Sequence, residues 1–141
     1  MLTPKQHAEV ESHVEEGDEF LDAGNFDKAL EKYHQAAALI PEPKTDDESA
    51  LSVFTAMGEA LFHSGRYAEA ISAFQTAAKA PGGIENPLVH LRLGEAYFEL
   101  GDLDRAADEL MRAYMLDGKE ILEGPEERKY FEFLKTRADL E

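Results

Sequence analysis

Residues 58–80 read GEALFHSGRYAEAISAFQTAAKA, and glycine, alanine and aromatic residues recur in this stretch at helical spacing. Its seven marker positions are Gly58, Leu61, Gly65, Tyr67, Ala70, Phe74 and Ala77. The same order lies 41 residues upstream, as Gly17, Phe20, Gly24, Phe26, Ala29, Tyr33 and Ala36, and 36 residues downstream, as Gly94, Tyr97, Gly101, Leu103, Ala106, Leu110 and Ala113. Three copies in one chain predict a repeat architecture, in which each unit buries its apolar face against its neighbours.

The pattern resembles the tetratricopeptide repeat, a helix–turn–helix unit of 34 residues. The resemblance covers about residues 10–118, and the longer spacings place the extra residues between repeats. Leu103 and Leu110 of the third copy depart from the family, which usually has aromatic residues there. The resemblance implies an all-α, right-handed α-solenoid in a free-standing single domain, residues 1–141. We expect three helix–turn–helix units at about 10–43, 51–84 and 87–120, and a C-terminal capping helix at about 125–139.

Local signals predict where the helices begin. Thr3-Pro4-Lys5-Gln6 combines an N-cap, a proline at the first helical position and a capping-box partner, so the first helix starts there. Thr45 and Glu48 predict a second capping box, with a helix from about Asp46 to His63. Asn86-Pro87 predicts the start of the fifth helix.

The C-terminal stretch after Gly124 predicts one more helix, with acidic residues at its start. Tyr130, Phe133 and Leu134 are expected to cover the apolar side of the third repeat, because a solenoid exposes the face of its last unit unless a helix caps it. A separate docking helix is the alternative. The string KYFEFLKTR is similar to the tails of small bacterial repeat proteins encoded beside toxin systems.

Composition limits the classes of partner. The formal charge of −16, from 30 acidic and 14 basic residues, argues against nucleic-acid binding because phosphate backbones would be repelled. The chain has no cysteine, which suits a reducing cytoplasm. Neither an export signal nor a run of membrane-spanning length is present in the sequence, so we expect a soluble cytoplasmic protein that is not bound to a membrane.

No motif in the sequence predicts catalysis, a cofactor or a metal site. The five histidines form no H-x-x-x-H or HExxH pair, and His13 and His90 fall at positions expected to pack between helices. Neither a G-x-S-x-G motif nor a glycine-rich phosphate loop occurs. The sequence therefore predicts a protein that is not an enzyme.

The family's concave surface is formed by the first helix of each unit, and the repeat register predicts which residues line it. Four rows emerge: Val14, Thr55 and Leu91; Leu21, Phe62 and Phe98; Asp18, Glu59 and Glu95; and Asp22, His63 and Glu99. Arg92 lies beside them. Apolar and acidic rows alternate, which predicts a ligand segment with basic and apolar side chains.

Some family members carry a carboxylate clamp of Lys, Asn and Arg that grips the acidic tails of heat-shock chaperones. Only Arg92 matches that motif here, while Val14, Asp18, Ala56 and Leu88 replace its other residues. The sequence therefore predicts that this clamp is absent.

Two hypotheses of different class follow. The first is a protein-interaction adaptor or chaperone that binds a basic and apolar segment of a partner in the groove. The second is an immunity protein or other inhibitor that covers a basic toxin with its acidic surface. A monomer and a weak dimer both stay open.

Overall fold

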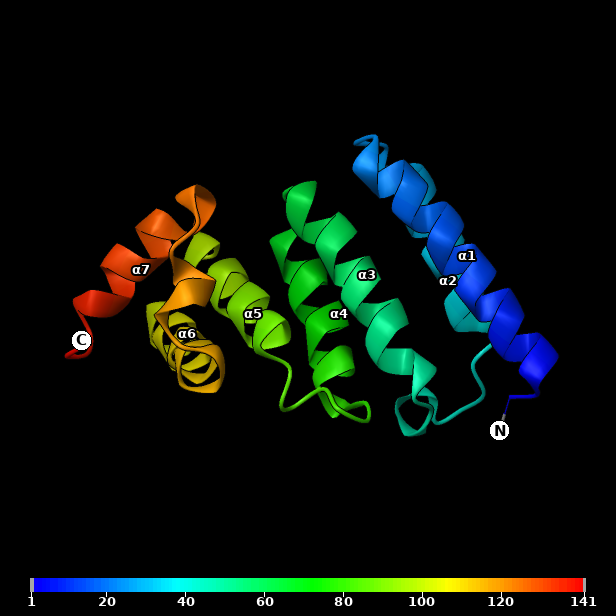
Figure 1. Cartoon of the computed structure of the whole chain (residues 1–141). Coiled ribbons are helices and arrows are strands. Elements are labelled where there is room, and N and C mark those ends of the chain that lie inside the picture. Colours follow the sequence, from blue (N-terminus) through cyan, green and yellow to red (C-terminus); the bar gives the residue numbers. More distant parts are fainter. Residues whose placement is uncertain (1, 141) are drawn as a thin grey trace.

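The computed structural model describes residues 2–140, which form helices without any strand (Figure 1). Seven α-helices lie in this part of the chain: α1 (Pro4–Asp22), α2 (Phe26–Ala38), α3 (Ser49–His63), α4 (Tyr67–Lys79), α5 (Pro87–Glu99), α6 (Leu103–Asp117) and α7 (Arg128–Lys135). Three short 3-10 helices connect them: η1 (Lys44–Asp46), η2 (Lys119–Leu122) and η3 (Pro125–Glu127). The first six α-helices form three antiparallel pairs stacked in a row, with α7 at the end of the row (Figure 1). The predicted all-α solenoid is confirmed.

In each pair, a glycine of the first helix lies where the two helices approach most closely. The contact recurs between Gly17 and Tyr33, Gly58 and Phe74, and Gly94 and Leu110. A Cβ atom added at Gly58 would lie 2.6 Å from the ring of Phe74, closer than two carbon atoms can approach. The marker alanines of the second helices, Ala29, Ala70 and Ala106, are fully buried. The repeat pattern therefore identified the packing positions of the pairs.

Turns between paired helices use the other marker glycines. Gly24, Gly65 and Gly101 have φ angles of 77°, 80° and 82°, in the left-handed region that favours glycine. Each turn reverses the chain in a few residues and sets the second helix antiparallel to the first.

Two of the predicted helix starts are confirmed. Thr3 and Gln6 form the capping box: the amide of Gln6 donates to Thr3 Oγ1 at 3.1 Å, and the amide of Thr3 donates to Gln6 Oε1 at 2.9 Å. The side chain of Asn86 accepts hydrogen bonds from the amides of Leu88 and Val89, and Pro87 follows it as the first helical residue.

The capping box predicted for Thr45 and Glu48 is wrong. Residues Lys44–Asp46 form η1, the backbone is extended at Asp47, and α3 begins only at Ser49. The carboxylate of Asp47 accepts a hydrogen bond from the amide of Ser49 at 2.8 Å. Asp47 thus satisfies a free amide at the start of α3, and the side chain of Glu48 forms no capping bond.

The last helix is shorter than the predicted span of residues 125–139. The 3-10 helix η3 precedes it, and hydrogen bonds between residues three apart follow Lys135. Its side chains Tyr130 and Leu134 are buried in a cluster with Leu91, Leu110, Ala113 and Leu122. Helix α7 therefore packs on the third pair with the apolar side chains that the sequence indicated.

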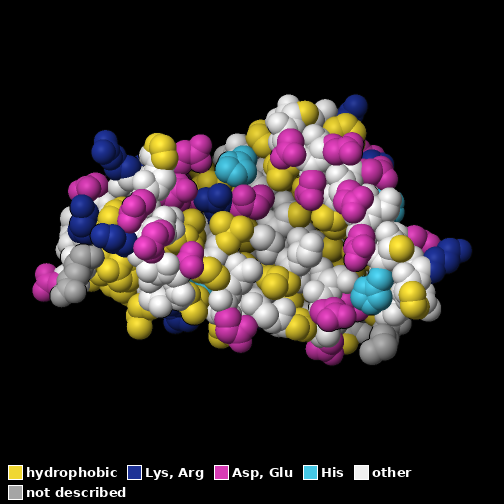
Figure 2. Space-filling model, in the orientation of Figure 1, with side chains coloured by type: hydrophobic (Ala, Val, Ile, Leu, Met, Phe, Trp, Pro, Cys, Tyr) yellow, Lys and Arg dark blue, Asp and Glu magenta, His cyan; other side chains and the backbone are white. Residues whose placement is uncertain are grey.

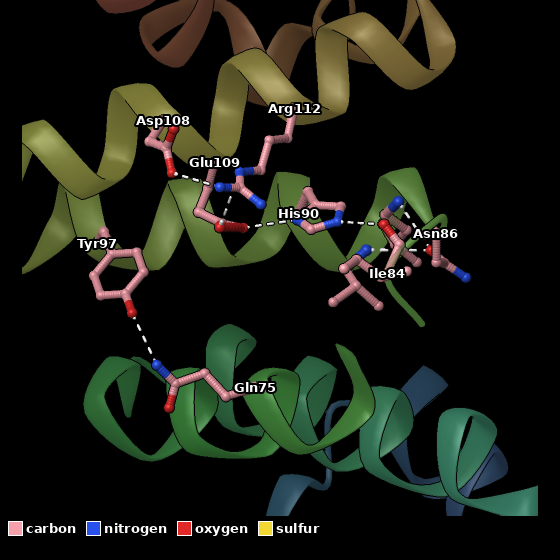
Figure 3. Close-up of polar contacts among 10 residues, drawn as sticks. Gln75, Ile84, Asn86, His90, Tyr97, Asp108, Glu109 and Arg112 are labelled. Carbon is pink, nitrogen blue, oxygen red and sulfur yellow. Dashed lines mark hydrogen bonds and ion pairs between the residues drawn. The ribbon is translucent and has the colours of Figure 1, made fainter. Parts of the chain in front are cut away.

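Polar contacts between the later helices are shown in Figure 3. His90 of α5 is buried, with Nδ1 2.8 Å from Glu109 Oε2 of α6 and Nε2 donating to the carbonyl oxygen of Ile84 at 2.7 Å. Gln75 of α4 donates to the hydroxyl of Tyr97 on α5 at 3.0 Å. His90 thus packs between helices, as its repeat position predicts. Within residues 2–140 no helix is long and apolar enough to cross a membrane.

Candidate functional site

The first helices of the three pairs, α1, α3 and α5, lie together on one face of the solenoid (Figure 1). Figure 2 shows this face, with acidic side chains gathered over α1 and α3 and basic side chains mainly over α7. Helix α1 alone contains seven carboxylates and one lysine. Helix α1 is therefore the most acidic of the three first helices.

The residues predicted to contact a partner lie on these three helices. Helix α1 carries Val14, Asp18, Leu21 and Asp22; α3 carries Thr55, Glu59, Phe62 and His63; and α5 carries Leu91, Arg92, Glu95, Phe98 and Glu99. Exposure falls stepwise along the acidic row from the first repeat to the third. Asp18 is exposed, the side chain of Glu59 is 18% exposed, and that of Glu95 is 1% exposed. The groove is therefore open over α1 and α3 and closed over α5.

The burial of Leu91 and Glu95 differs from the prediction that both line an open groove. Leu91 is buried in the cluster beneath α7. Glu95 lies close enough to Glu127, at the end of η3, for the two charges to interact. The C-terminal segment covers this part of the concave face, so neither side chain is accessible to a partner in this conformation.

Phe98 also contacts the C-terminal segment. Its ring packs edge-on against Tyr130, at a centroid distance of 5.3 Å, and against Phe133 at 5.1 Å. The hydroxyl of Tyr130 donates to Glu99 Oε1 at 2.8 Å, and Lys129 forms an ion pair with the same carboxylate. Phe98 and Glu99 thus hold α7 in place, where the repeat register alone had assigned them to a partner.

A charged network joins α3 and α5 at the centre of the face. Arg92 Nε donates to Glu59 Oε1 at 2.6 Å, and Nη1 donates to Glu95 Oε1 at 2.8 Å. The guanidinium lies over the ring of Phe62, 5.4 Å from its centroid, and His63 Nε2 lies 3.4 Å from Glu59 Oε2. Arg92 therefore has two carboxylate partners and a ring within the chain, and it is not free to grip an acidic tail.

Burial and pairing shift the pKa values of these groups in different directions. Burial raises the pKa of Glu95 to about 7, against the opposing effect of Arg92, and its Oε2 atom is buried without a hydrogen-bond partner. Burial also acts on Glu59, but hydrogen bonds from His63 and Arg92 outweigh it and hold its pKa below the ordinary value. The hydrogen bond to Glu59 raises the pKa of His63. Glu95 is therefore the carboxylate of this network that is least stable in its charged form.

The open part of the face contains a cavity of about 490 Å³ between α1 and α3, lined by His7, Val10, Glu11, Val14, Glu15, Glu48, Ser49 and Ser52. Only Val14 of this set is among the predicted groove residues. His7 Nδ1 lies 3.1 Å from Ser49 Oγ and links the two helices. Repeat positions alone did not indicate the whole cavity, because His7 precedes the repeat unit and Glu48 and Ser49 belong to the insertion between repeats. The capping box at Thr3 was the available signal that α1 extends this far.

Among the residues that the structure describes, the groove carboxylates of α1 lack the ion pairs that Glu95 and Glu99 of α5 form. Asp18 Oδ1 accepts a hydrogen bond of 2.6 Å from the hydroxyl of Tyr33, and Asp22 is exposed. In the part of the chain that the structure describes, neither aspartate forms an ion pair with a basic side chain. No group of three or more histidine and carboxylate side chains in residues 2–140 is arranged to hold a metal ion.

Comparison with solved structures identifies the fold. The first tetratricopeptide domain of Spaghetti (RPAP3) bound to the HSP90 peptide SRMEEVD is 20% identical, with a TM-score of 0.71 over 91% of this chain and 94% of that chain. The second domain of the same protein, bound to the same peptide, is 20% identical with a TM-score of 0.69 over 82% and 100%. PcrH in complex with the chaperone binding region of PopB is 20% identical, with a TM-score of 0.68 over 97% and 98%. At these identities the likeness shows the fold.

Comparison of the sequence finds one family model that matches part of the chain. A tetratricopeptide-repeat family model matches residues 55–115, which span α4 and α5 entirely and most of α3 and α6. No curated protein matches the chain in sequence. The family model covers most of the second and third repeats, and solved tetratricopeptide-repeat domains share the fold over all three helix pairs, so the chain is similar to tetratricopeptide-repeat proteins in both sequence and fold.

Proposed function

We propose that the chain is a non-catalytic interaction module, an adaptor or chaperone, that holds a segment of a partner protein in its concave groove. Proteins of the same fold support this: domains of RPAP3 bind an HSP90 peptide, and PcrH binds a region of PopB. The part of the groove available to a partner is the surface over α1 and α3.

The proposed segment carries basic and apolar side chains. The observation that carries this proposal is that two carboxylates without an ion pair in the described chain, Asp18 and Asp22, lie on the same helix face as the half-buried Val14 and Leu21. Residues 14, 18, 21 and 22 share a face because they are spaced at three, four and seven residues. An acidic tail is disfavoured, because Arg92 is paired within the chain and the remaining charges over α1 repel it.

The test is binding of the partner that co-purifies from the native host, measured as association and dissociation rates. The variant Asp18→Asn/Asp22→Asn removes two groove charges. Glu9→Gln/Glu31→Gln removes two exposed charges elsewhere: Glu9 lies nine residues from Asp18, about half a turn around α1, and Glu31 lies on α2. We expect the first variant to slow association several-fold and to reduce its salt dependence, while the second stays close to wild type.

The dissociation rate of the bound segment is expected to depend on the apolar row that contains Leu21. Leu21→Ala should increase the dissociation rate with little effect on association, because the loss of a buried contact acts after encounter. If neither the aspartate variant nor Leu21→Ala changes either rate, the concave face is not the binding site.

A second candidate is an inhibitor of the immunity-protein type, which would neutralise a basic toxin. The observation that favours it is the spread of carboxylates around α1, since Glu9, Glu16 and Glu19 lie outside the groove rows. An inhibitor of this kind depends on the acidic surface as a whole. The two double variants would then slow association alike, which separates this function from groove binding.

A further inference from the structure

Similar contacts join α3 to α5 and α5 to α7 along the concave face. Arg92 of α5 lies over the ring of Phe62 on the preceding first helix and pairs with Glu59 of that helix. Lys129, at the start of α7, lies 5.9 Å from the ring centroid of Phe98 on α5 and pairs with Glu99. In both places a cation from the next element lies near a ring of the preceding first helix and pairs with a carboxylate of that helix, although Glu99 stands one turn beyond the repeat position of Glu59.

Between α1 and α3, no cation stands at the repeat position of Arg92. Ala56 of α3 stands 36 residues before Arg92, at the same repeat position. Arg92 contacts Glu59 and Phe62 on α3. The residues of α1 at the same repeat positions, 41 residues earlier, are Asp18 and Leu21. A carboxylate and an apolar side chain are therefore present at the matching positions of α1, and the small side chain of Ala56 provides no cation.

The hydroxyl of Tyr33 donates a hydrogen bond of 2.6 Å to Asp18 at this position. Burial, the hydrogen bond to Asp18 and the charges of Asp18, Asp22 and Glu59 together raise the pKa of Tyr33, so all three carboxylates lie within electrostatic reach of its hydroxyl. Arg92 and His63 offset the charge of Glu59. The charges of Asp18 and Asp22 have no such compensation within the described chain.

We propose that an arginine or lysine of the partner protein supplies the missing cation, lying on Leu21 beside Ala56 and pairing with Asp18 and Asp22. The proposal rests on the function proposed above and names the anchor residue of the bound segment. A long basic side chain fits because its aliphatic stem packs on apolar surface while its charged end reaches carboxylates. The contact repeats the one that Arg92 makes on α3.

The experiment supplies the cation from the chain itself. A displayed library of random short peptides is selected on the wild-type protein, and the selected peptides are measured on Ala56→Arg, which adds a charged side chain, and on Ala56→Gln, which adds a shorter uncharged polar one. The expected result is enrichment of arginine or lysine in the peptides, and a loss of affinity on Ala56→Arg of at least about tenfold. Ala56→Gln should bind within about threefold of wild type, because it adds a side chain without the charge.

A second pair of variants keeps the test decisive if Ala56→Arg unfolds. Asp22→Lys places a positive charge on the exposed rim of the same position, and Glu9→Lys makes the same change on the far side of α1. Asp22→Lys should weaken the peptides as strongly as Ala56→Arg, and Glu9→Lys should weaken them much less.

The outcomes distinguish the proposed basic anchor residue from groove binding in general. Peptides that lose affinity on Asp18→Asn/Asp22→Asn or Leu21→Ala but bind Ala56→Arg and Asp22→Lys like wild type would overturn the anchor and leave groove binding standing. Peptides without enrichment in basic residues would also overturn it. Selection of no peptide at all, or of peptides indifferent to every groove variant, would count against the proposed function itself.

Discussion

Replacing Glu95 by glutamine should stabilise the protein at neutral and alkaline pH. Glu95 is 1% exposed, and one of its oxygens has no hydrogen-bond partner. Glutamine has the same shape, its carbonyl oxygen can accept the bond from Arg92, and it carries no charge that burial would penalise. Arg92 keeps Glu59 as its counter-charge in the variant.

The magnitude follows from the pKa of Glu95. Burial raises that pKa from 4.5 to about 7, which corresponds to about 3 kcal/mol at about 1.4 kcal/mol per unit. Because the folded protein holds this proton more tightly than the unfolded chain, the stabilisation is complete below about pH 4.5 and is lost as the pH rises toward about 7. Above pH 7 the wild type carries the full cost of a buried charge, and Glu95→Gln does not.

Urea unfolding followed by circular dichroism, at intervals from about pH 5.5 to about pH 8, measures the difference between the two proteins. The advantage of Glu95→Gln should grow with pH to about 2–3 kcal/mol at about pH 8. The comparison cancels the titration of groups that both proteins share. An advantage that stays constant across this range, or a variant less stable than wild type at about pH 8, would refute the reasoning, because Glu95 would then be stable as a charged partner of Arg92.

Three further changes test the packing. Ala70→Leu should destabilise by about 1–3 kcal/mol in urea unfolding, because the site is fully buried and has no room for added methylenes; a loss below about 0.5 kcal/mol would contradict the packing position. Gly58→Ala should also lower the urea midpoint, although alanine normally favours a helix by about 1 kcal/mol, because the new Cβ would meet the buried ring of Phe74 at 2.6 Å. Removal of residues 124–141 should expose the cluster around Leu122 and increase binding of an apolar dye, with light scattering to detect association; an unchanged melting temperature would mean that α7 does not cap the third repeat.

The position of the C-terminal segment changed the extent of the candidate site. From the repeat positions, Phe98 and Phe62 look equivalent, yet α7 covers Phe98 and Arg92 covers Phe62. A repeat identifies positions that are equivalent in sequence, and the two ends of a solenoid have different neighbours. The candidate site over α1 and α3 is therefore the part of the predicted groove that the C-terminal segment does not cover.

The sequence by itself determined the helices, their pairing and the packing positions. Glycines such as Gly58 recur because two helices approach too closely for a Cβ atom, and the cap at Thr3 depends on atoms within a few residues. Signals of this kind are local or periodic, so they can be read without coordinates. The start of α3 was misplaced because Thr45 and Asp47 offer competing local bonds, and only the folded loop selects Asp47.

Only the tertiary structure decided which groove residues are accessible and which carboxylates are paired. Tyr130 reaches Glu99 across 31 residues of sequence, and Arg92 reaches Glu59 across 33. Neither α7 nor the insertion before α3 repeats elsewhere in the chain, so periodicity carries no information about where they pack. The burial of Glu95 and the pairing of Glu59 both follow from these contacts, because a charge is stabilised or penalised by what surrounds it in space.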